Sequence, residues 1–246
     1  MPMSAHEVRQ ALHELGDLRY ASGNLDEALR RIVQCTHDLF AVDGAGLMLV
    51  DPDQLLRSVA DSDKRVGDLE ELQIRHGEGP CIDAFDDKEL VHAADLTAED
   101  RWPDFSPAAV DRGLRAVLAS PIPYNQMAIG VVTVFSSEVH PWTPEGELAL
   151  VAFTDLAALT IANTMQSEQR GELADQLQRA LDARVLIEQA KGALVAREGV
   201  SPGAAFERMR RQARTERRRV VEVAREILIT ARHSGVEGPD QASRRS

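Results

Sequence analysis

The residues best suited to chemistry are cations near the C-terminal end of the chain. Within positions 208–219 there are seven arginines, namely Arg208, Arg210, Arg211, Arg214, Arg217, Arg218 and Arg219. Arginine suits the forked binding of phosphate oxygens and stacking on unpaired bases. Pairing with Glu207, Glu216 and Glu222 on a solvated helix face would explain some of these arginines. It does not explain seven of them in twelve residues, so the segment predicts a nucleic-acid contact.

Lys191 and Gly192 lie upstream, in a segment with helical periodicity. A glycine inside a helix costs about 1 kcal/mol relative to alanine, so close approach of another backbone or of a ligand should offset that cost. The charge distribution points the same way, because residues 1–165 carry 12 basic and 28 acidic residues and residues 166–246 carry 16 and 12. We expect the acidic part to repel phosphate polymers and the C-terminal part to attract them.

A second conspicuous feature is the loop from His76 to Cys81, with the sequence HGEGPC. Gly77 and Gly79 permit positive φ, and a helix beginning at Cys81 would expose backbone N–H groups and lower the pKa of the thiol. This predicts an anion or small-ligand pocket, or a redox-sensing thiol, at Gly77, Gly79 and Cys81. The alternative is a tight turn over a buried cysteine, and a single thiol without a partner favours it.

Other sequence features exclude several classes of protein. The seven histidines show no metal-ligand spacing, and no nucleophile elbow, Walker loop, paired-carboxylate motif or phosphoacceptor pattern is present. We therefore expect no enzyme activity, no metal and no cofactor. The N-terminus lacks the apolar stretch of a signal peptide, and the apolar run at residues 128–135 is too short to span a bilayer. These patterns predict a soluble, cytoplasmic protein without a membrane partner.

The N-terminal part reads as an α+β domain, an antiparallel sheet flanked by helices. Helices are expected at residues 5–20, 26–41 and 63–75, and strands at 46–50, 55–60, 89–96, 115–122 and 128–135. The last two strands, joined by Pro123 to Met127, are expected to form a hairpin. The stretch with Trp102, Pro103 and Pro107 is expected to be a surface segment.

After Thr143 and Pro144 the pattern is helical for more than 50 residues without proline. Leu148, Val151, Leu156 and Leu159 form a stripe that we expect to cover the sheet. The stripe continues through Leu173, Leu177 and Leu181. This predicts a long linking helix that forms a coiled coil, and hence a homodimer.

The chain closes with three predicted helices. The first continues the long helix to about Arg197, the second starts at Ser201-Pro202 and ends near Arg214, and the third covers 217–232. The apolar positions expected in their core are Ala205, Phe206, Met209, Ala213, Val220, Val223, Ala224, Ile227, Leu228 and Ala231. The polar residues after Ser234 are expected to be disordered.

The segment 183–228 resembles an ANTAR domain, the RNA-binding module of bacterial transcription antiterminators. The matching positions are Ala190-Lys191-Gly192-x-Leu194, Ser201, Ala205-Phe206, Met209-Arg210-x-x-Ala213 and Val220-x-x-Val223-Ala224. Val195, Arg214 and Val220 depart mildly from the usual pattern. Residues 1–165 resemble a GAF domain of the kind that precedes ANTAR in actinobacterial regulators, through GEGPC at 77–81, Trp102-Pro103 and Arg115 to Ser120.

The resemblance implies a three-helix module that binds paired hairpin loops, the tandem stem-loops of mRNA leaders, and prevents terminator formation. Lys191 and the arginines would hold phosphates or stack bases, while Ala190 and Gly192 would let the RNA approach. The implied RNA-binding residues are Ala190, Lys191, Gly192, Arg210, Arg211, Arg214, Arg217, Arg218 and Arg219. The GAF part either binds an unidentified small ligand or only dimerises and positions the RNA modules.

The predicted division is a GAF-like domain at 1–165, a coiled-coil linker at 166–182, an all-α three-helix ANTAR domain at 183–233 and a tail at 234–246. Two other functions are weighed against antitermination. One is a GAF-fold thiol enzyme similar to methionine sulfoxide reductases, with Cys35 and Cys81 as nucleophile and resolving residue. The other is a DNA-binding regulator, because the connection at 200–205 and the arginine-rich helices also suit a helix-turn-helix.

Overall fold

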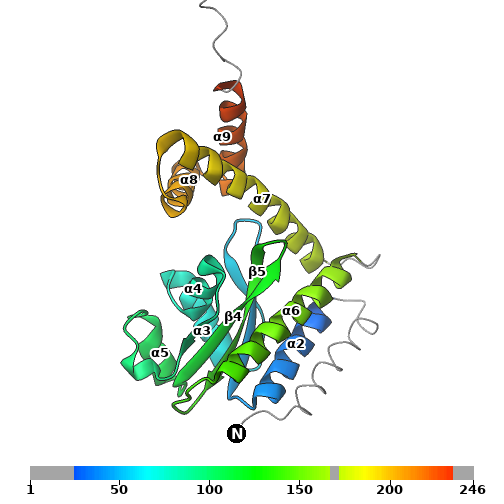
Figure 1. Ribbon diagram of the computed structural model, residues 1–246, viewed down its shortest axis with the longest axis vertical. Coiled ribbons are helices and arrows are strands. Elements are labelled where there is room, and N and C mark those ends of the chain that lie inside the picture. The colour runs from blue at the N-terminus through cyan, green and yellow to red at the C-terminus, as the bar shows by residue number, and fades with distance from the viewer. Residues whose placement is uncertain (1–24, 167–171, 235–246) are drawn as a thin grey trace, which may run out of the picture. The chain divides into compact units, whose positions relative to one another are not determined.

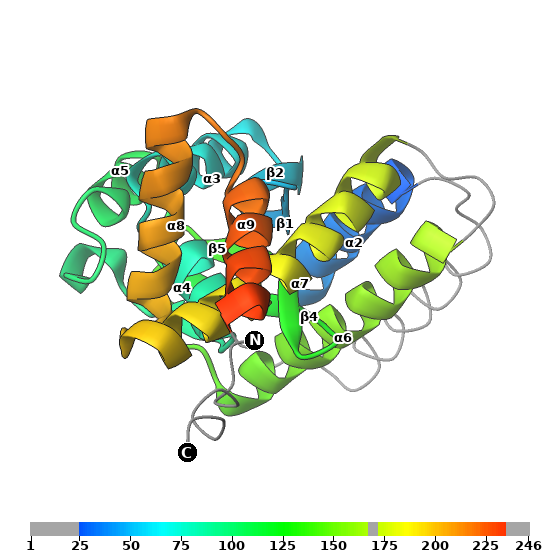
Figure 2. The same ribbon diagram turned by 90° about the horizontal axis from the view of Figure 1, so that it is seen from above.

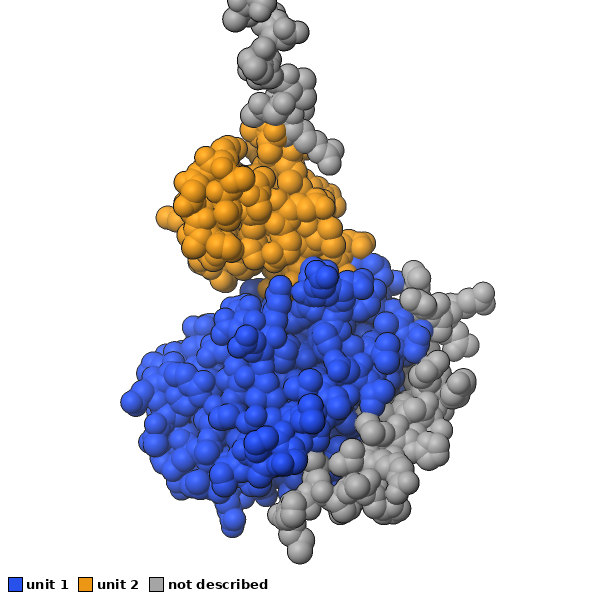
Figure 3. All heavy atoms as spheres, viewed as in Figure 1, with its two compact units in different colours: residues 1–51, 55–178 blue, residues 52–54, 179–246 orange. Residues whose placement is uncertain are grey.

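The computed structural model describes residues 25–166 and 172–234. The helix expected at 5–20 and nearly all of the expected tail lie outside these residues. The chain divides into two compact units, which comprise residues 1–51 with 55–178 and residues 52–54 with 179–246 (Figure 3). The division at residue 178 falls inside the predicted linker.

The first unit is built on one antiparallel sheet of five strands, in the order β2-β1-β5-β4-β3. The strands are β1 (Gly44–Val50), β2 (Leu56–Asp61), β3 (Val91–Ala93), β4 (Ala116–Tyr124) and β5 (Met127–Ser136). All five predicted strands are present, and β3 is shorter than expected. The sheet and its flanking helices confirm the predicted α+β class.

The hairpin between β4 and β5 forms as predicted. Tyr124 pairs with Met127 across a two-residue loop, and both loop residues have positive φ, at 47° for Asn125 and 65° for Gln126. Two residues of positive φ give the tight loop whose twist matches that of the flanking strands. Val131, Val132, Thr133 and Val134 supply the β-branched residues that favour a buried strand.

Helices cover both faces of this sheet (Figure 1). On one face lie α2 (Leu25–Phe40) and α6 (Pro144–Gln166), which run side by side (Figure 2). On the other face lie α3 (Lys64–His76) and α4 (Pro80–Asp87). Successive side chains of β4 point to opposite faces of the sheet. Ser120 contacts Thr154 of α6 at 3.1 Å on one face. Its neighbour Ala119 pairs with Thr133, and the Thr133 hydroxyl contacts Cys81 of α4 on the other face.

Helix α3 lies directly on the glycines of β1. A Cβ added at Gly44 would lie 2.6 Å from a methyl group of Val66, and one added at Gly46 would collide with the Glu70 carboxyl. Asp63 caps the first turn of α3 by accepting hydrogen bonds from the N–H groups of Arg65 and Val66. The two glycines of β1 thus allow this helix to approach the sheet more closely than any side chain would permit.

The segment predicted at the surface is only partly exposed: Pro103 and Pro107 are exposed as predicted, but Trp102 is buried. Trp102 is 1% exposed and Phe105 is fully buried, and their rings meet edge to face at 5.9 Å. Phe105 is the first residue of a short helix, α5 (Phe105–Asp111), which the sequence analysis did not predict because prolines lie within and beside it. The indole N–H of Trp102 donates to Asp83 at 2.8 Å, which satisfies the buried nitrogen.

Helix α6 faces the sheet with residues other than those predicted. Leu150, Phe153, Ala157 and Ile161 are fully buried and form its inner side. By contrast, the predicted stripe points outward: Leu148 is 69% exposed, Leu159 57% and Val151 36%. The sequence error arose because α6 is apolar on all sides. By length and composition its residues Pro144–Met165 could also cross a membrane, a test that the core helix of a soluble protein equally passes.

The second unit contains most of α7 (Glu172–Glu198), with α8 (Pro202–Glu216) and α9 (Val220–Ser234). Ser201 caps α8 through the N–H of Ala204, and Pro202 occupies the first turn. The buried core consists of Ile187, Ala190, Leu194, Ala205, Met209, Ala213, Val223 and Ala224. The three predicted helices are confirmed. Residues 167–171 are outside the described range, so a continuous coiled coil stays a prediction.

Candidate nucleic-acid interface

An aromatic ring flanked by two cations stands at the edge of the core of the second unit. Phe206 of α8 is half-buried and packs against this core. The Lys191 Nζ of α7 and the Arg210 guanidinium carbon of α8 each lie 5.8 Å from the centre of its ring. Both distances are within the range of cation–π attraction. The fold therefore joins Lys191, from the first helix, to Phe206 and Arg210, from the second.

Each of these two cations is also held by a glutamate one turn before it. Lys191 Nζ contacts the two carboxylate oxygens of Glu188 at 2.9 and 3.1 Å, and Arg210 Nη1 donates to Glu207 at 2.9 Å. Their side chains are 21% and 33% exposed. The pairs orient the cations beside the ring without removing them from solvent, since exposed ion pairs of this spacing exchange readily.

Apart from Arg210, which is paired with Glu207, the crowded arginines fall into two groups of three. The first is paired with acids: Arg208 with Glu198, Arg219 with Asp53 at 4.0 Å, and Arg218 with Glu216 and Glu226 at 2.8 and 2.7 Å. The hydrogen bonds to Glu226 and Glu216 raise the pKa of Arg218. This group bears out the alternative reading for some of the arginines. The ion pairs of Arg218 with Glu216 of α8 and Glu226 of α9 link the two helices, which is a structural role.

The second group comprises Arg211, Arg214 and Arg217. All three are exposed, and none has an ion pair or side-chain hydrogen bond within residues 25–166 and 172–234. Arg210 and Arg214 are four residues apart on α8, and Arg211 and Arg214 are three apart, so they share one side of the helix. Arg217 ends α8 with a φ of 53°. These uncompensated charges therefore continue from the Phe206 cluster along α8.

Ala190 and Gly192, both predicted to let RNA approach the helix, differ in burial. Ala190 is fully buried in the core, so its side chain packs the three helices and is not part of the surface that RNA could approach. This corrects its predicted role. Gly192 is exposed, and a Cβ added to it would meet no atom within 4 Å. Packing within the unit does not require glycine there, and the space above it is open to a ligand.

The glycine loop of the first unit is structural. Gly77 ends α3 with a φ of 73°, and Gly79 precedes α4 with a φ of 132° at a place where a Cβ would lie 2.5 Å from the Gln73 side chain. Cys81 is fully buried, and burial raises the pKa of its thiol to about 12. This contradicts the predicted lowering of the thiol pKa and favours the alternative of a tight turn over a buried cysteine.

The two cysteines lie on opposite faces of the sheet. The Cys81 Sγ contacts the Thr133 hydroxyl at 2.9 Å under α4, whereas Cys35 belongs to α2 on the other face. They cannot act together as nucleophile and resolving thiol, because a disulfide needs Cα atoms within about 7 Å. Among the described residues, moreover, no group of three or more His, Cys, Asp and Glu side chains could hold a metal.

A feature that sequence reasoning missed is Glu70 of α3. Its side chain is fully buried, and neither carboxylate oxygen has a partner of hydrogen-bond geometry. Desolvation raises the pKa of Glu70 to about 8, the nearby charge of Asp61 adds to the rise, and the Ser58 hydroxyl opposes it. The available signal was its spacing, since Glu70 lies four residues after the buried Val66 and beside the buried Leu69.

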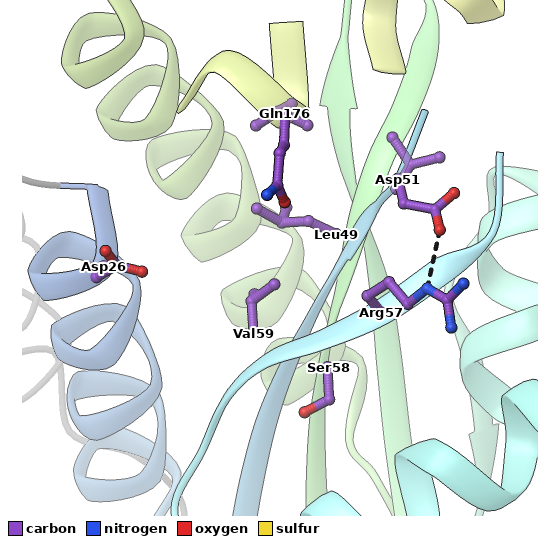
Figure 4. A pocket seen from close by; sticks show the side chains of 9 residues that line it. Asp26, Leu49, Asp51, Arg57, Ser58, Val59 and Gln176 are labelled. Atoms are coloured by element: carbon purple, nitrogen blue, oxygen red, sulfur yellow. Dashed lines mark hydrogen bonds and ion pairs between the residues drawn. The ribbon is translucent and has the colours of Figure 1, made fainter. Parts of the chain in front are cut away.

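A pocket of about 440 Å³ opens beside the hairpin of β1 and β2 in the first unit (Figure 4). Its lining residues are Asp26, Leu49, Val50, Asp51, Arg57, Ser58, Val59, Gln176 and Leu177. Arg57 donates to Asp51 at 2.8 Å, so the cation that lines the pocket is already paired. The pocket gives room for a small molecule, and its charged lining residues are Asp26, Asp51 and Arg57.

A five-stranded antiparallel sheet between helices, followed by a three-helix unit with exposed arginines, defines a two-domain protein. The family model of the GAF domain matches residues 24–161, and that of the ANTAR domain matches residues 175–228. The chain therefore belongs to the GAF family and has the GAF–ANTAR architecture. This is the architecture of an RNA-binding antitermination regulator with a regulatory sensor domain, and not that of an enzyme.

Solved structures support the fold of the first unit. The chain is similar to the GAF domains of phosphoenolpyruvate-protein phosphotransferases from Acinetobacter (18% identity, TM-score 0.51) and Coxiella burnetii (20%, 0.54), each match covering 65% of this chain and 95% of the other. It also resembles free methionine-R-sulfoxide reductase from Neisseria meningitidis (17%, 0.53), over 66% and 94% of the two chains. Identities this low show the fold alone. No curated protein matches the chain.

Proposed function

We propose that the second unit binds the unpaired loop bases of paired hairpins in nascent mRNA and thereby prevents a terminator from forming. The observation that carries this proposal is the Phe206 ring, with Lys191 and Arg210 each 5.8 Å from its centre. Recognition of RNA sequence relies on unstacked bases that lie on aromatic side chains or guanidinium planes. This cluster supplies both kinds of surface next to open space at Gly192.

In this proposal some residues stack on bases and others bind phosphates, according to their position on the surface. A loop base stacks on the exposed part of the Phe206 ring or on the Arg210 guanidinium. Stacking of a base on an aromatic ring is worth about 1–3 kcal/mol per base. Arg211, Arg214 and Arg217 hold the phosphates that follow, because their charges are not neutralised by acids. Arg218 and Arg219 contribute less, since they are engaged with Glu226 and Asp53.

The proposal also includes a homodimer, in which two copies present two such surfaces to the two hairpins. Holding both loops at once raises the effective concentration of the second contact, so affinity rises without new contacts. The GAF domain supplies the input, either by binding a small molecule or by setting how the two copies associate.

The test is binding of the full chain to a labelled RNA with two hairpins, measured by fluorescence anisotropy. Lys191→Glu should abolish specific binding, and Arg211→Glu with Arg214→Glu should weaken it at least tenfold. Arg225→Glu is the matched control, because Arg225 is equally exposed but lies on α9 outside the cluster. Equal losses in all variants would reduce the effect to overall charge and refute the proposed surface.

The same assay separates RNA from duplex DNA. Unlabelled hairpin RNA should displace the probe, and duplex DNA of equal charge should not. Effective competition by the duplex would favour the helix-turn-helix alternative instead.

A further inference from the structure

The aromatic cluster around Phe206 carries no net charge. Its two cations are each balanced by an acid, Lys191 by Glu188 and Arg210 by Glu207, with a nitrogen–oxygen distance of 2.9 Å in both pairs. Further along α8, the charges of Arg211, Arg214 and Arg217 have no ion pair among the described residues. The second unit therefore presents a neutral surface around an aromatic ring and a cationic surface beside it.

A neutral aromatic surface suits a nucleic-acid base better than a phosphate. A phosphate brought to either cation would also approach the paired glutamate, and the repulsion between like charges would offset part of the attraction. A base has no net charge, so it gains the stacking contact without this cost. We therefore expect phosphates at the arginines that lack acids and a base at Phe206.

The two glutamates of the cluster differ in the acceptors that they leave open. Both carboxylate oxygens of Glu188 contact Lys191 Nζ, at 2.9 and 3.1 Å. Glu207 uses only Oε1, towards Arg210, and within residues 25–166 and 172–234 no hydrogen bond reaches its Oε2. The Glu207 side chain is also the more exposed of the two, at 59% against 41%. Glu207 thus offers a ligand an acceptor, whereas Glu188 holds Lys191.

Glu207 lies at the border of the surface on which a base would stack. It follows Phe206 directly in α8, and its partner Arg210 lies beside the Phe206 ring. An ionised carboxylate can only accept hydrogen bonds, so it favours groups that donate. The exocyclic amino groups of adenine, cytosine and guanine donate, whereas uracil carries carbonyl oxygens in their place, and a carboxylate repels these oxygens.

We propose that Glu207 is a specificity-determining residue of the RNA interface, which selects a loop base with an exocyclic amino group at Phe206 and rejects uracil there. This rests on the proposed binding of hairpin loops and adds to it the chemistry of the base. Glu188 is a positioning residue, because it acts on the RNA through Lys191. The arginines that lack acids add affinity without this selectivity, since phosphates carry no sequence information.

Two-hairpin RNAs with randomised loops, selected on the full chain, supply the probes for a test. At one loop position the selected RNAs should carry an amino-bearing base, and replacing this base by uracil should weaken binding about tenfold. Removing the amino group alone should cost most of that affinity. Inosine does this for guanine, purine riboside for adenine and pyrimidin-2-one riboside for cytosine.

Glu207→Gln puts an amide, which both donates and accepts, in place of the carboxylate. The ratio of the affinities for the amino-bearing base and for uracil should then fall at least about fivefold. Glu216→Gln is the matched control, since Glu216 is another exposed acid of α8 but is paired with Arg218 outside the cluster. It should leave the ratio unchanged, and circular dichroism checks that both variants fold.

Two results would overturn the assignment of Glu207. One is a change in Glu207→Gln that affects all loops by the same factor, because the carboxylate would then act through its charge alone. The other is selection of uracil at every loop position as readily as of amino-bearing bases. If Lys191→Glu still abolishes binding in either case, the proposed RNA surface stands without this selectivity. A chain that binds no hairpin RNA would refute both proposals.

Discussion

Replacing the buried Glu70 by glutamine should remove a pH dependence from the stability of the GAF domain. The folded chain holds the Glu70 proton up to a pKa of about 8, against an ordinary value of 4.5. Between these values the unfolded chain releases a proton that the folded chain keeps. Stability is therefore fully present at acid pH and is lost as the pH rises towards 8, by about 1.4 kcal/mol per pH unit.

The loss at pH 7 amounts to about 3 kcal/mol, and near pH 8, where Glu70 is half ionised in the folded chain, it reaches about 4 kcal/mol. Glu70→Gln cannot ionise, so this contribution to the pH dependence should disappear. The cost of burying the amide is the same at every pH and does not alter the slope. The variant should consequently gain stability over the wild type by about 1.4 kcal/mol for each unit of pH between 5 and 8.

Urea unfolding at pH 5, 6, 7 and 8 measures this difference. Both tryptophans, Trp102 and Trp142, belong to the first unit, so their fluorescence reports that unit alone. Glu71→Gln is the matched control, since Glu71 is the exposed neighbour on α3. If wild type and Glu70→Gln lose stability in parallel as the pH rises, Glu70 is not a buried neutral acid and the reasoning is refuted.

Three further predictions concern the loops and the proposed interface. Gly192→Ala should stabilise α7 by up to about 1 kcal/mol, measured in thermal melts. The same variant should bind RNA more weakly, because the added methyl group occupies the open space at this position. Unchanged affinity would mean that RNA does not approach the helix there. Replacing Arg211, Arg214 and Arg217 with glutamine should make the slope of log affinity against log salt concentration less negative by about 2. This is the change expected when three contacts to single-stranded phosphates are lost, and an unaltered slope would exclude these arginines as phosphate ligands. The Cys81 thiol should not react with a thiol reagent at pH 8 until the chain is unfolded, and rapid labelling of the native protein at this position would contradict its burial.

The elements of this protein were largely readable from its sequence because they depend on neighbours along the chain. The hairpin of β4 and β5 follows from β-branched runs around a short loop, and α8 follows from Ser201 and Pro202. The core of the second unit also follows, since Ala205, Met209 and Ala213 recur at helical spacing. Local propensity, capping and period act within a few residues, and a sequence displays them directly.

Contacts between distant residues could not be read in this way. Helix α6 is apolar all round, so its period does not tell the inner side from the outer, and only the packed sheet shows that Leu148 and Leu159 point outward. The burial of Glu70 depends on two glycines of β1, and the indole N–H of the buried Trp102 is satisfied by Asp83, 19 residues away in the sequence. Charge composition likewise marked the arginine-rich segment as a whole. Which arginines are neutralised depends on acids brought near by folding, because an ion pair needs its two charges within about 4 Å in space and not in sequence.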